Sequence, residues 1–227
     1  VFFNINKYKL LLICLFFFYV LFYFLGSFPS WVALFFELLA GKGVGNFSEK
    51  DIVGYFLTPV SFFGLGRLEG GSLLAWKMAL IYNLLLAMVL AGIQFWLNQR
   101  KCWALLKNIR YPQMVFNSGL LFLGLGFGWF FYPQNWSGDI FSWLGLANLW
   151  LAVFSAWFFS VLVNDEEDLS TDLITNPLRP LPQKIFSLEE YRQYWSVFLF
   201  FSLFSPLLID WRFFFLFVTY HLLTFAY

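Results

Sequence analysis

The chain has 227 residues, of which 61% are hydrophobic and only 12% are charged, and its formal net charge is +1. A soluble globular protein carries about 25% charged residues, so this composition favours a protein embedded in a lipid bilayer. The small net charge, without a concentrated basic surface, argues against nucleic-acid binding. The two cysteines, Cys14 and Cys102, form neither a disulfide framework nor a metal-binding spacing.

Long apolar segments are the main signal along the chain, because a helix that crosses a bilayer needs about 20 mostly apolar residues. In chain order, the predicted spans are 10–28, 78–97, 114–132, 140–163, 194–209 and a sixth that begins at residue 213. The stretch 52–66 is apolar but short and interrupted by glycine and proline, which predicts a re-entrant or interfacial segment. The sequence therefore predicts an all-α, multi-spanning transmembrane helical bundle with about six spans.

The distribution of basic residues predicts the orientation. The connection 98–112 holds four basic residues and no acidic one, whereas the connection 133–139 holds no basic residue. Short basic loops face the cytoplasm, and two spans separate 98–112 from 164–192. We therefore expect a multi-pass integral membrane protein whose Asp-rich loop is cytoplasmic. Because the chain begins with Val and its last apolar segment runs to residue 227, we also expect a truncated chain.

Acidic residues gather directly after the fourth predicted span, in the stretch NDEEDLSTD that begins at Asn164. Asn164, Asp168 and Asp172 are four residues apart, so on a continuing helix they share one face, which Asp165 can join. Like charges at this spacing destabilise a helix and favour a compensating cation. Oxygen ligands without His or Cys are typical of Mg²⁺ bound together with phosphate oxygens, and not of zinc or copper. A solvated acidic loop is the alternative interpretation.

The next stretch, NPLRPLP, predicts a rigid extended turn. Such a turn can fold Arg179 back over the acidic residues. Arg179 and Lys184 would then hold phosphate oxygens, with the guanidinium binding two at once. The substrate expected for this site is a diphosphate whose lipid tail lies among the helices.

These stretches resemble the UbiA-type membrane prenyltransferases. NDEEDLSTD matches the family's N-D-x-x-D-x-x-x-D signature, and NPLRPLP matches the N-x-x-x-RP-x-P stretch that follows it, although Asn176 lies one place later than usual and QK replaces Ser-Gly. NIRYPQ is similar to the family's Arg-Pro start of the first helix, with Arg110 in the Arg place. The resemblance covers residues 107–227, as the N-terminal half of such a domain. Residues 1–106 are expected to be an N-terminal membrane extension of unknown role.

The resemblance implies an enzyme that moves a prenyl group from a prenyl diphosphate to a lipophilic acceptor, an aromatic or quinone precursor, with Mg²⁺ as cofactor and release of diphosphate. It assigns catalysis to Asp168 and Asp172, metal binding to these two together with Asn164 and Asp165, and substrate binding to Asn164, Arg110, Arg179 and Lys184. The family's second Asp-rich motif is not among the 227 residues, so the resemblance implies that this chain alone is inactive.

Other functions remain open at this point. The main alternative is a non-catalytic membrane protein or a remnant that lacks the second motif. A transporter with an acidic ion site is also possible, although the RP-x-P stretch has no role in it. A CDP-alcohol phosphotransferase is disfavoured, because its motifs need glycine and none follows Gly145.

Overall fold

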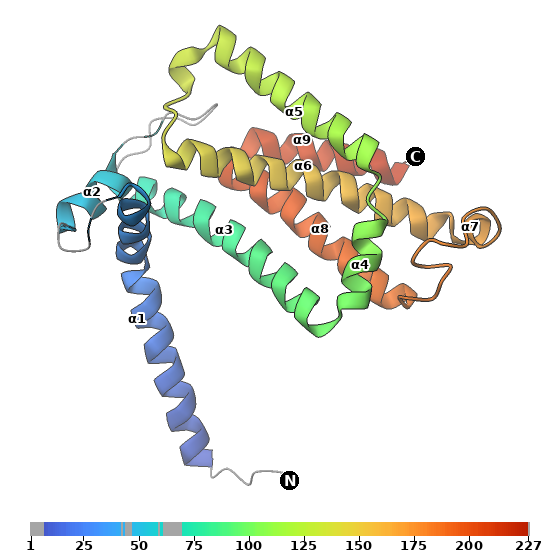
Figure 1. Cartoon of the computed structure of the whole chain (residues 1–227), viewed down its shortest axis with the longest axis horizontal. Helices are drawn as coiled ribbons and strands as arrows, with labels where there is room; N and C mark the ends of the chain where they lie inside the picture. Colours follow the sequence, from blue (N-terminus) through green and yellow to red (C-terminus); the bar gives the residue numbers. More distant parts are fainter. Residues whose placement is uncertain (1–6, 42, 44–46, 59, 61–69, 227) are drawn as a thin grey trace. The chain divides into compact units, whose positions relative to one another are not determined.

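The computed structural model describes residues 7–41, 43, 47–58, 60 and 70–226. Over these residues the chain forms nine α-helices and one short 3₁₀ helix, and no strand is present in this described part (Figure 1). This confirms the all-α prediction. The chain divides into two compact units, residues 1–58 and residues 59–227, and each is described by itself.

The first unit contains two helices. Helix α1 covers Lys7–Leu39 and continues through Pro29, so it is longer than the predicted segment 10–28. Helix α2 covers Glu49–Leu57 and starts at a capping box, in which the Ser48 backbone N–H donates to Asp51 at 2.7 Å. Of the predicted re-entrant segment 52–66, residues 59 and 61–66 lie outside the described residues.

The second unit is a bundle organised around one central helix, α6, which packs on α3, α5, α8 and α9 (Figure 1). Its helices are α3 (Gly70–Leu97), α4 (Gln99–Lys107), α5 (Tyr111–Phe131), α6 (Ile140–Glu167), α7 (Leu169–Thr175), α8 (Leu188–Ile209) and α9 (Trp211–Ala226), with the 3₁₀ helix at Pro133–Asn135. Helices α3 and α8 run antiparallel: the Trp76 indole of α3 donates to the Leu208 carbonyl near the end of α8 at 2.7 Å.

Four helices in the described part of the chain are long and apolar enough to cross a membrane. These segments are Leu15–Leu39 in α1, Ser72–Leu97 in α3, α5 and α6. They are compatible with an integral membrane protein and match four of the predicted spans. Helix α8 does not meet this criterion and α9 is shorter, so the fifth and sixth spans stay predictions.

A polar contact joins three helices inside the bundle. The Asn83 amide of α3 donates to Asn148 of α6 at 2.7 Å and to Ser205 of α8 at 2.8 Å. All three side chains are buried. Hydrogen bonds between membrane helices stabilise their association by about 0.6 kcal/mol each on average, so this contact helps to fix the packing of α3, α6 and α8.

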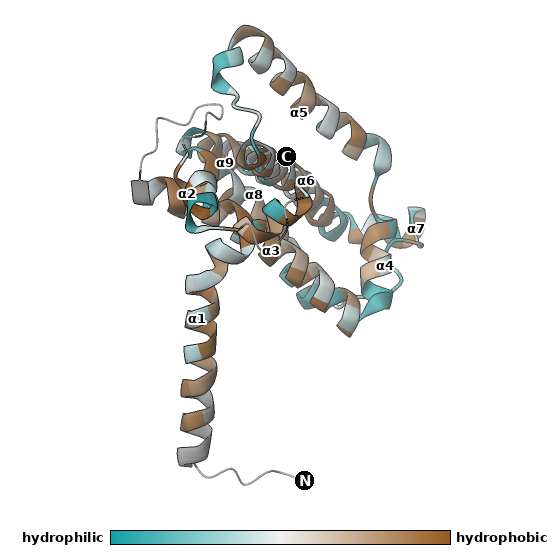
Figure 2. Cartoon of the chain, turned by 60° about the vertical axis from the view of Figure 1, so that its left-hand side comes forward, coloured by the Kyte–Doolittle hydropathy of each residue, from teal (hydrophilic) through white to brown (hydrophobic). Residues whose placement is uncertain are grey.

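Polar residues gather at one end of the second unit. Figure 2 shows hydrophilic residues around α4 and α7, and mainly hydrophobic residues along α5. The contacts described below bring together helix α4, the start of α5, the end of α6 and the start of α8. The connections 98–112 and 164–192 therefore lie at the same end of the bundle, as the predicted topology requires.

Candidate functional site

The Asp-rich stretch lies where α6 gives way to α7. Asp168 stands between the two helices: its N–H donates to the Asn164 carbonyl at 2.9 Å, and its carbonyl accepts the Asp172 N–H at 2.8 Å. The backbone therefore keeps helix-like hydrogen bonds through the stretch. The expected single helix from α6 to Asp172 is wrong, however, because the helix is interrupted at Asp168, and the carboxylates separate into a buried pair and an exposed group.

Asp165 is the centre of the buried part, with only 1% of its surface exposed. One carboxylate oxygen accepts from Arg110 at 3.2 Å and from Arg179 at 3.0 Å. The other accepts from Asn108 at 2.6 Å and from the Tyr191 hydroxyl at 3.1 Å. A buried carboxylate needs such partners, and these four donors come from the α4–α5 connection, the loop after α7, and α8.

Asp172 is the second buried carboxylate and lies in the first turn of α7. Arg179 contacts it with the same nitrogen that binds Asp165, and the Asn176 amide donates to its other oxygen at 2.9 Å. The NPLRPLP stretch therefore folds Arg179 back onto the acidic residues, as the sequence predicted. Arg179 bridges two carboxylates that would otherwise repel each other.

Asn164 and Asp168 form an exposed pair beside this network. The Asn164 amide nitrogen donates to Asp168 at 2.8 Å, and both residues are exposed. No other side-chain hydrogen bond of either residue is found among the described residues. The side-chain oxygen of Asn164 and the second carboxylate oxygen of Asp168 are therefore available to a ligand.

Tyr191 completes the buried network from α8. Burial, followed by the adjacent Asp165 carboxylate, raises the pKa of Tyr191 above its usual range. Its hydroxyl therefore keeps its proton and donates it to Asp165. Tyr191 is fully buried and its ring packs edge-on against Phe186 at 5.5 Å between centroids, so the donor is held in place.

The oxygen atoms of this site fit Mg²⁺ in part. Magnesium in proteins uses one or two carboxylates, keeps several waters and shares the oxygens of a phosphate substrate. Asn164 and Asp168 offer ligands of this kind, whereas both oxygens of Asp165 already accept hydrogen bonds from the protein. In the described part of the chain, no group of three His, Cys, Asp or Glu residues is placed to hold a metal. The pair therefore suits an ion shared with a phosphate, and not an all-protein cage.

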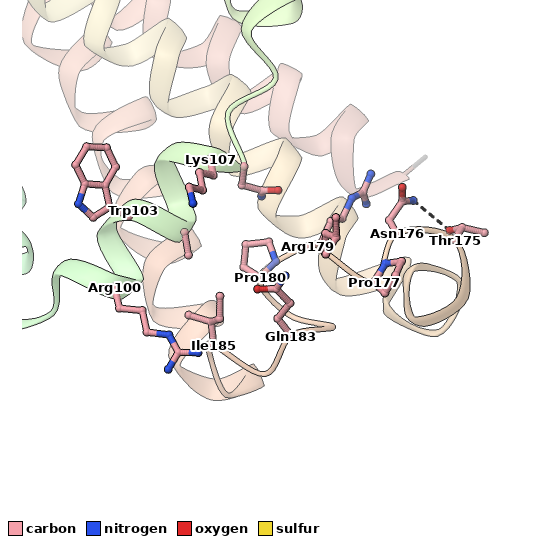
Figure 3. Close-up of a pocket in the computed structure, with 13 residues that line it drawn as sticks. Arg100, Trp103, Lys107, Thr175, Asn176, Pro177, Arg179, Pro180, Gln183 and Ile185 are labelled. Atoms are coloured by element: carbon pink, nitrogen blue, oxygen red, sulfur yellow. Dashed lines mark hydrogen bonds between the residues drawn. The ribbon is translucent and has the colours of Figure 1, made fainter.

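A cavity of about 900 Å³ lies between α4 and the loop that follows α7 (Figure 3). Its lining includes three basic residues, Arg100, Lys107 and Arg179. The remaining lining residues are Trp103, Ala104, Asn108, Thr175, Asn176, Pro177, Leu178, Pro180, Gln183 and Ile185. Arg179, Asn108 and Asn176 also contact the buried carboxylates, so the cavity and the acidic network share these three residues.

The other predicted substrate-binding residues, Arg110 and Lys184, do not line this cavity. Arg110 contacts Asp165 and is half-buried. Lys184 is exposed, on the same loop, and its φ of 53° is in the left-handed region. No described contact tests its predicted role in substrate binding, which stays a prediction.

A second cavity, of about 400 Å³, lies among α5, α6 and α9. Its lining is mostly apolar and includes Val153, Trp157 and Leu223, with Tyr220 at one side. The Tyr220 hydroxyl is 2.9 Å from the Ser160 hydroxyl. This cavity has the character expected for an apolar chain or ring.

Several residues of the site were not predicted from the sequence. Asn108 and Tyr191 complete the shell of Asp165. Asn108 opens the NIRYPQ stretch, in which only Arg110 was assigned a role, and Tyr191 belongs to no motif. Arg100 and Lys107 were used only for orientation, although their spacing of seven residues places them on one face of a helix. That spacing could have indicated a shared basic face, but only if residues 99–107 had been predicted to be helical.

No protein-family model, no curated protein and no solved structure matches this chain. The function proposed next therefore depends on the residues and geometry described above. The resemblance of residues 107–227 to the UbiA-type prenyltransferases is used there as a hypothesis.

Proposed function

We propose that this chain supplies the first Asp-rich motif of a membrane prenyltransferase, which moves a prenyl group from a prenyl diphosphate to an aromatic or quinone precursor. The observation that carries the proposal is the exposed Asn164–Asp168 pair beside a buried network that holds Arg110 and Arg179. A diphosphate at this place would meet both cation ligands and guanidinium donors. We place this end of the bundle on the cytoplasmic side.

The proposed roles of the side chains follow from their contacts and exposure. Asn164 and Asp168 would hold a Mg²⁺ ion that accompanies the diphosphate, and Arg179 would donate to that diphosphate from the N–H groups that do not bind Asp165 and Asp172. Asp165 and Asp172 are positioning residues, because their hydrogen bonds fix the guanidinium of Arg179. Bound Mg²⁺ would supply positive charge where negative charge develops on the departing diphosphate.

The transfer breaks the bond between the first prenyl carbon and the diphosphate oxygen, and the electron pair leaves with the diphosphate. A new bond then forms between that carbon and the acceptor, which loses a proton. The apolar cavity among α5, α6 and α9 offers a place for the prenyl chain or the ring of the acceptor. The activity belongs to a protein that also has the second Asp-rich motif, which these 227 residues do not contain.

A second candidate is a non-catalytic membrane protein, and one observation favours it. Asp165 and Asp172 are already neutralised by Arg110 and Arg179, so the network is closed without any ligand. In that case the Asp-rich stretch would clamp the α4–α5 connection to α6 and α8. Ligand binding separates the two candidates.

The experiment is equilibrium binding of radiolabelled farnesyl diphosphate to the complete protein in detergent micelles, with and without Mg²⁺. Asp168→Asn should weaken the Mg²⁺-dependent binding by at least about tenfold, which is about 1.4 kcal/mol. Glu167→Gln is the matched control, because Glu167 is also exposed and adjacent in sequence but has no place in the site. Equal effects of the two substitutions would refute the metal site. No binding to the wild-type protein would favour the second candidate, a non-catalytic membrane protein.

A further inference from the structure

The cavity between α4 and the loop after α7 has a chemical character that the acidic network does not explain. Among the described residues that line it, three are basic and none is acidic. Arg100, Trp103 and Lys107 line it from α4, at positions that share one face of the helix. Figure 3 shows these side chains on one wall and the 175–185 loop on the other.

Helix α4 uses its basic residues in two different ways. Lys101 forms an ion pair with Glu190 of α8 at 2.5 Å, which ties α4 to the bundle. Arg100 and Lys107 line the cavity instead, and neither forms an ion pair with any described residue. Two cations without a counter-charge beside a cavity create a positive potential that attracts an anion.

The opposite wall adds hydrogen-bonding groups and rigidity. The amides of Asn176 and Gln183 line it, and Pro177 and Pro180 restrict the backbone between them. Arg179 also lines this wall, but its charge is balanced by the two buried carboxylates. The excess positive charge of the cavity therefore comes from α4.

The cavity also has an apolar border. Trp103 is 54% exposed and Leu178 is 84% exposed, one on each wall. Exposed Trp and Leu beside basic residues are typical of a surface at the membrane interface. A ligand that suits both the basic residues of α4 and this apolar border has an anionic group, such as a phosphate, and an apolar chain.

We propose that this cavity binds the phosphate group of an anionic membrane amphiphile, with Arg100 and Lys107 on the phosphate and the apolar chain against Trp103 and Leu178. The inference does not depend on prenyl transfer, because it uses neither Asn164 nor Asp168. The same phosphate chemistry has two sources, the headgroup of a membrane lipid or a free diphosphate, and the experiment separates them.

The test uses the full chain in detergent micelles, with three probes: short-chain phosphatidylglycerol, phosphatidylcholine of the same chain length, and inorganic diphosphate. Binding is measured by the rise in the thermal unfolding midpoint with probe concentration. Arg100→Gln combined with Lys107→Gln should weaken the binding of phosphatidylglycerol about 30-fold, which corresponds to about 1 kcal/mol for each basic residue. Arg192→Gln is the matched control: it removes a cation near the same end of the bundle, from a residue outside the cavity.

The inference is supported if phosphatidylglycerol binds more tightly than phosphatidylcholine and only the double substitution removes the difference. Binding of inorganic diphosphate that is lost in the same double variant supports the phosphate site with a soluble ligand as its source. Equal stabilisation by the two lipids, or phosphatidylglycerol binding unchanged by the double substitution, overturns it. Asp168→Asn should leave phosphatidylglycerol binding unchanged, which keeps this outcome separate from that of the proposed transferase.

Discussion

Replacing Asp165 by Asn is the sharpest test of the buried network. The Asp165 side chain accepts four hydrogen bonds and is almost completely buried. The substitution keeps the shape but removes the charge that balances two guanidinium groups. Removing one partner of a buried ion pair costs about 3–5 kcal/mol. The side chains of Arg110 and Arg179 are 33% and 24% exposed, so solvent stabilises part of their charge and we expect a loss of about 3 kcal/mol.

The assay is the free energy of unfolding in mixed micelles, from a sodium dodecyl sulfate titration followed by circular dichroism. Glu166→Gln is the matched control, because Glu166 is the next residue in sequence and also pairs with an arginine, but its partner Arg192 is 56% exposed. Exposed pairs contribute about 0–1 kcal/mol. If Asp165→Asn costs no more than Glu166→Gln, the buried network does not stabilise this end of the bundle and the reasoning is refuted.

Three further predictions concern orientation, pH and packing. In a cysteine-free background, Ser170→Cys should be labelled by an impermeant maleimide from the cytoplasm; labelling from the outside would reverse the topology. The hydrogen bond from Lys101 lowers the pKa of Glu190 below its usual 4.5, so the pair stabilises above that pH and is lost as the pH falls through the lowered pKa. The stability difference between wild type and Lys101→Met should therefore shrink below pH 4.5, and a difference independent of pH would contradict the pair. Asn148→Ala should cost about 1 kcal/mol of unfolding free energy, because it removes the acceptor of Asn83; a value near zero would argue against that contact.

Apolar runs predicted most of the long helices but not all of their ends. The apolar run predicted the start of α6 at Ile140 correctly, and the structure shows that Asp139 caps this start by accepting the Ser142 N–H at 2.7 Å. The predicted span ends at 163 and the helix was expected to continue to Asp172, whereas it continues through the first acidic residues only to Glu167. An acidic turn ends the apolar run without ending the helix, because its side chains find partners outside the helix.

Helix α4 was missed for a different reason. It has nine residues, starts at the Asn98 cap and carries several basic residues, so it gives no long apolar signal. Its apolar residues Ala104 and Leu105 are buried against the bundle. An amphipathic helix this short is recognised only when its neighbours are known, and two of the three basic residues of the cavity lie on it.

The acidic site was predicted in its local part only. The four-residue spacing predicted the contact between Asn164 and Asp168, and the proline-rich turn predicted the return of Arg179. The burial of Asp165 was not predicted, because it depends on Asn108 and Tyr191, which are distant in sequence and were assigned no role in the site. Local spacing decides which side chains are neighbours on a helix, whereas tertiary packing decides which of them reach solvent.

The measurement that tests the central claim most directly is the release of diphosphate from a labelled prenyl diphosphate by the complete protein, with an aromatic acceptor, in Mg²⁺ and in a chelator. The account predicts Mg²⁺-dependent release that Asp168→Asn reduces by roughly 100-fold or more, as expected when a group that stabilises developing charge is lost, and that Glu167→Gln leaves nearly unchanged. Release that is independent of Mg²⁺, or that is equally high in the Asp168→Asn variant, would contradict the assignment of a prenyltransferase site to this chain.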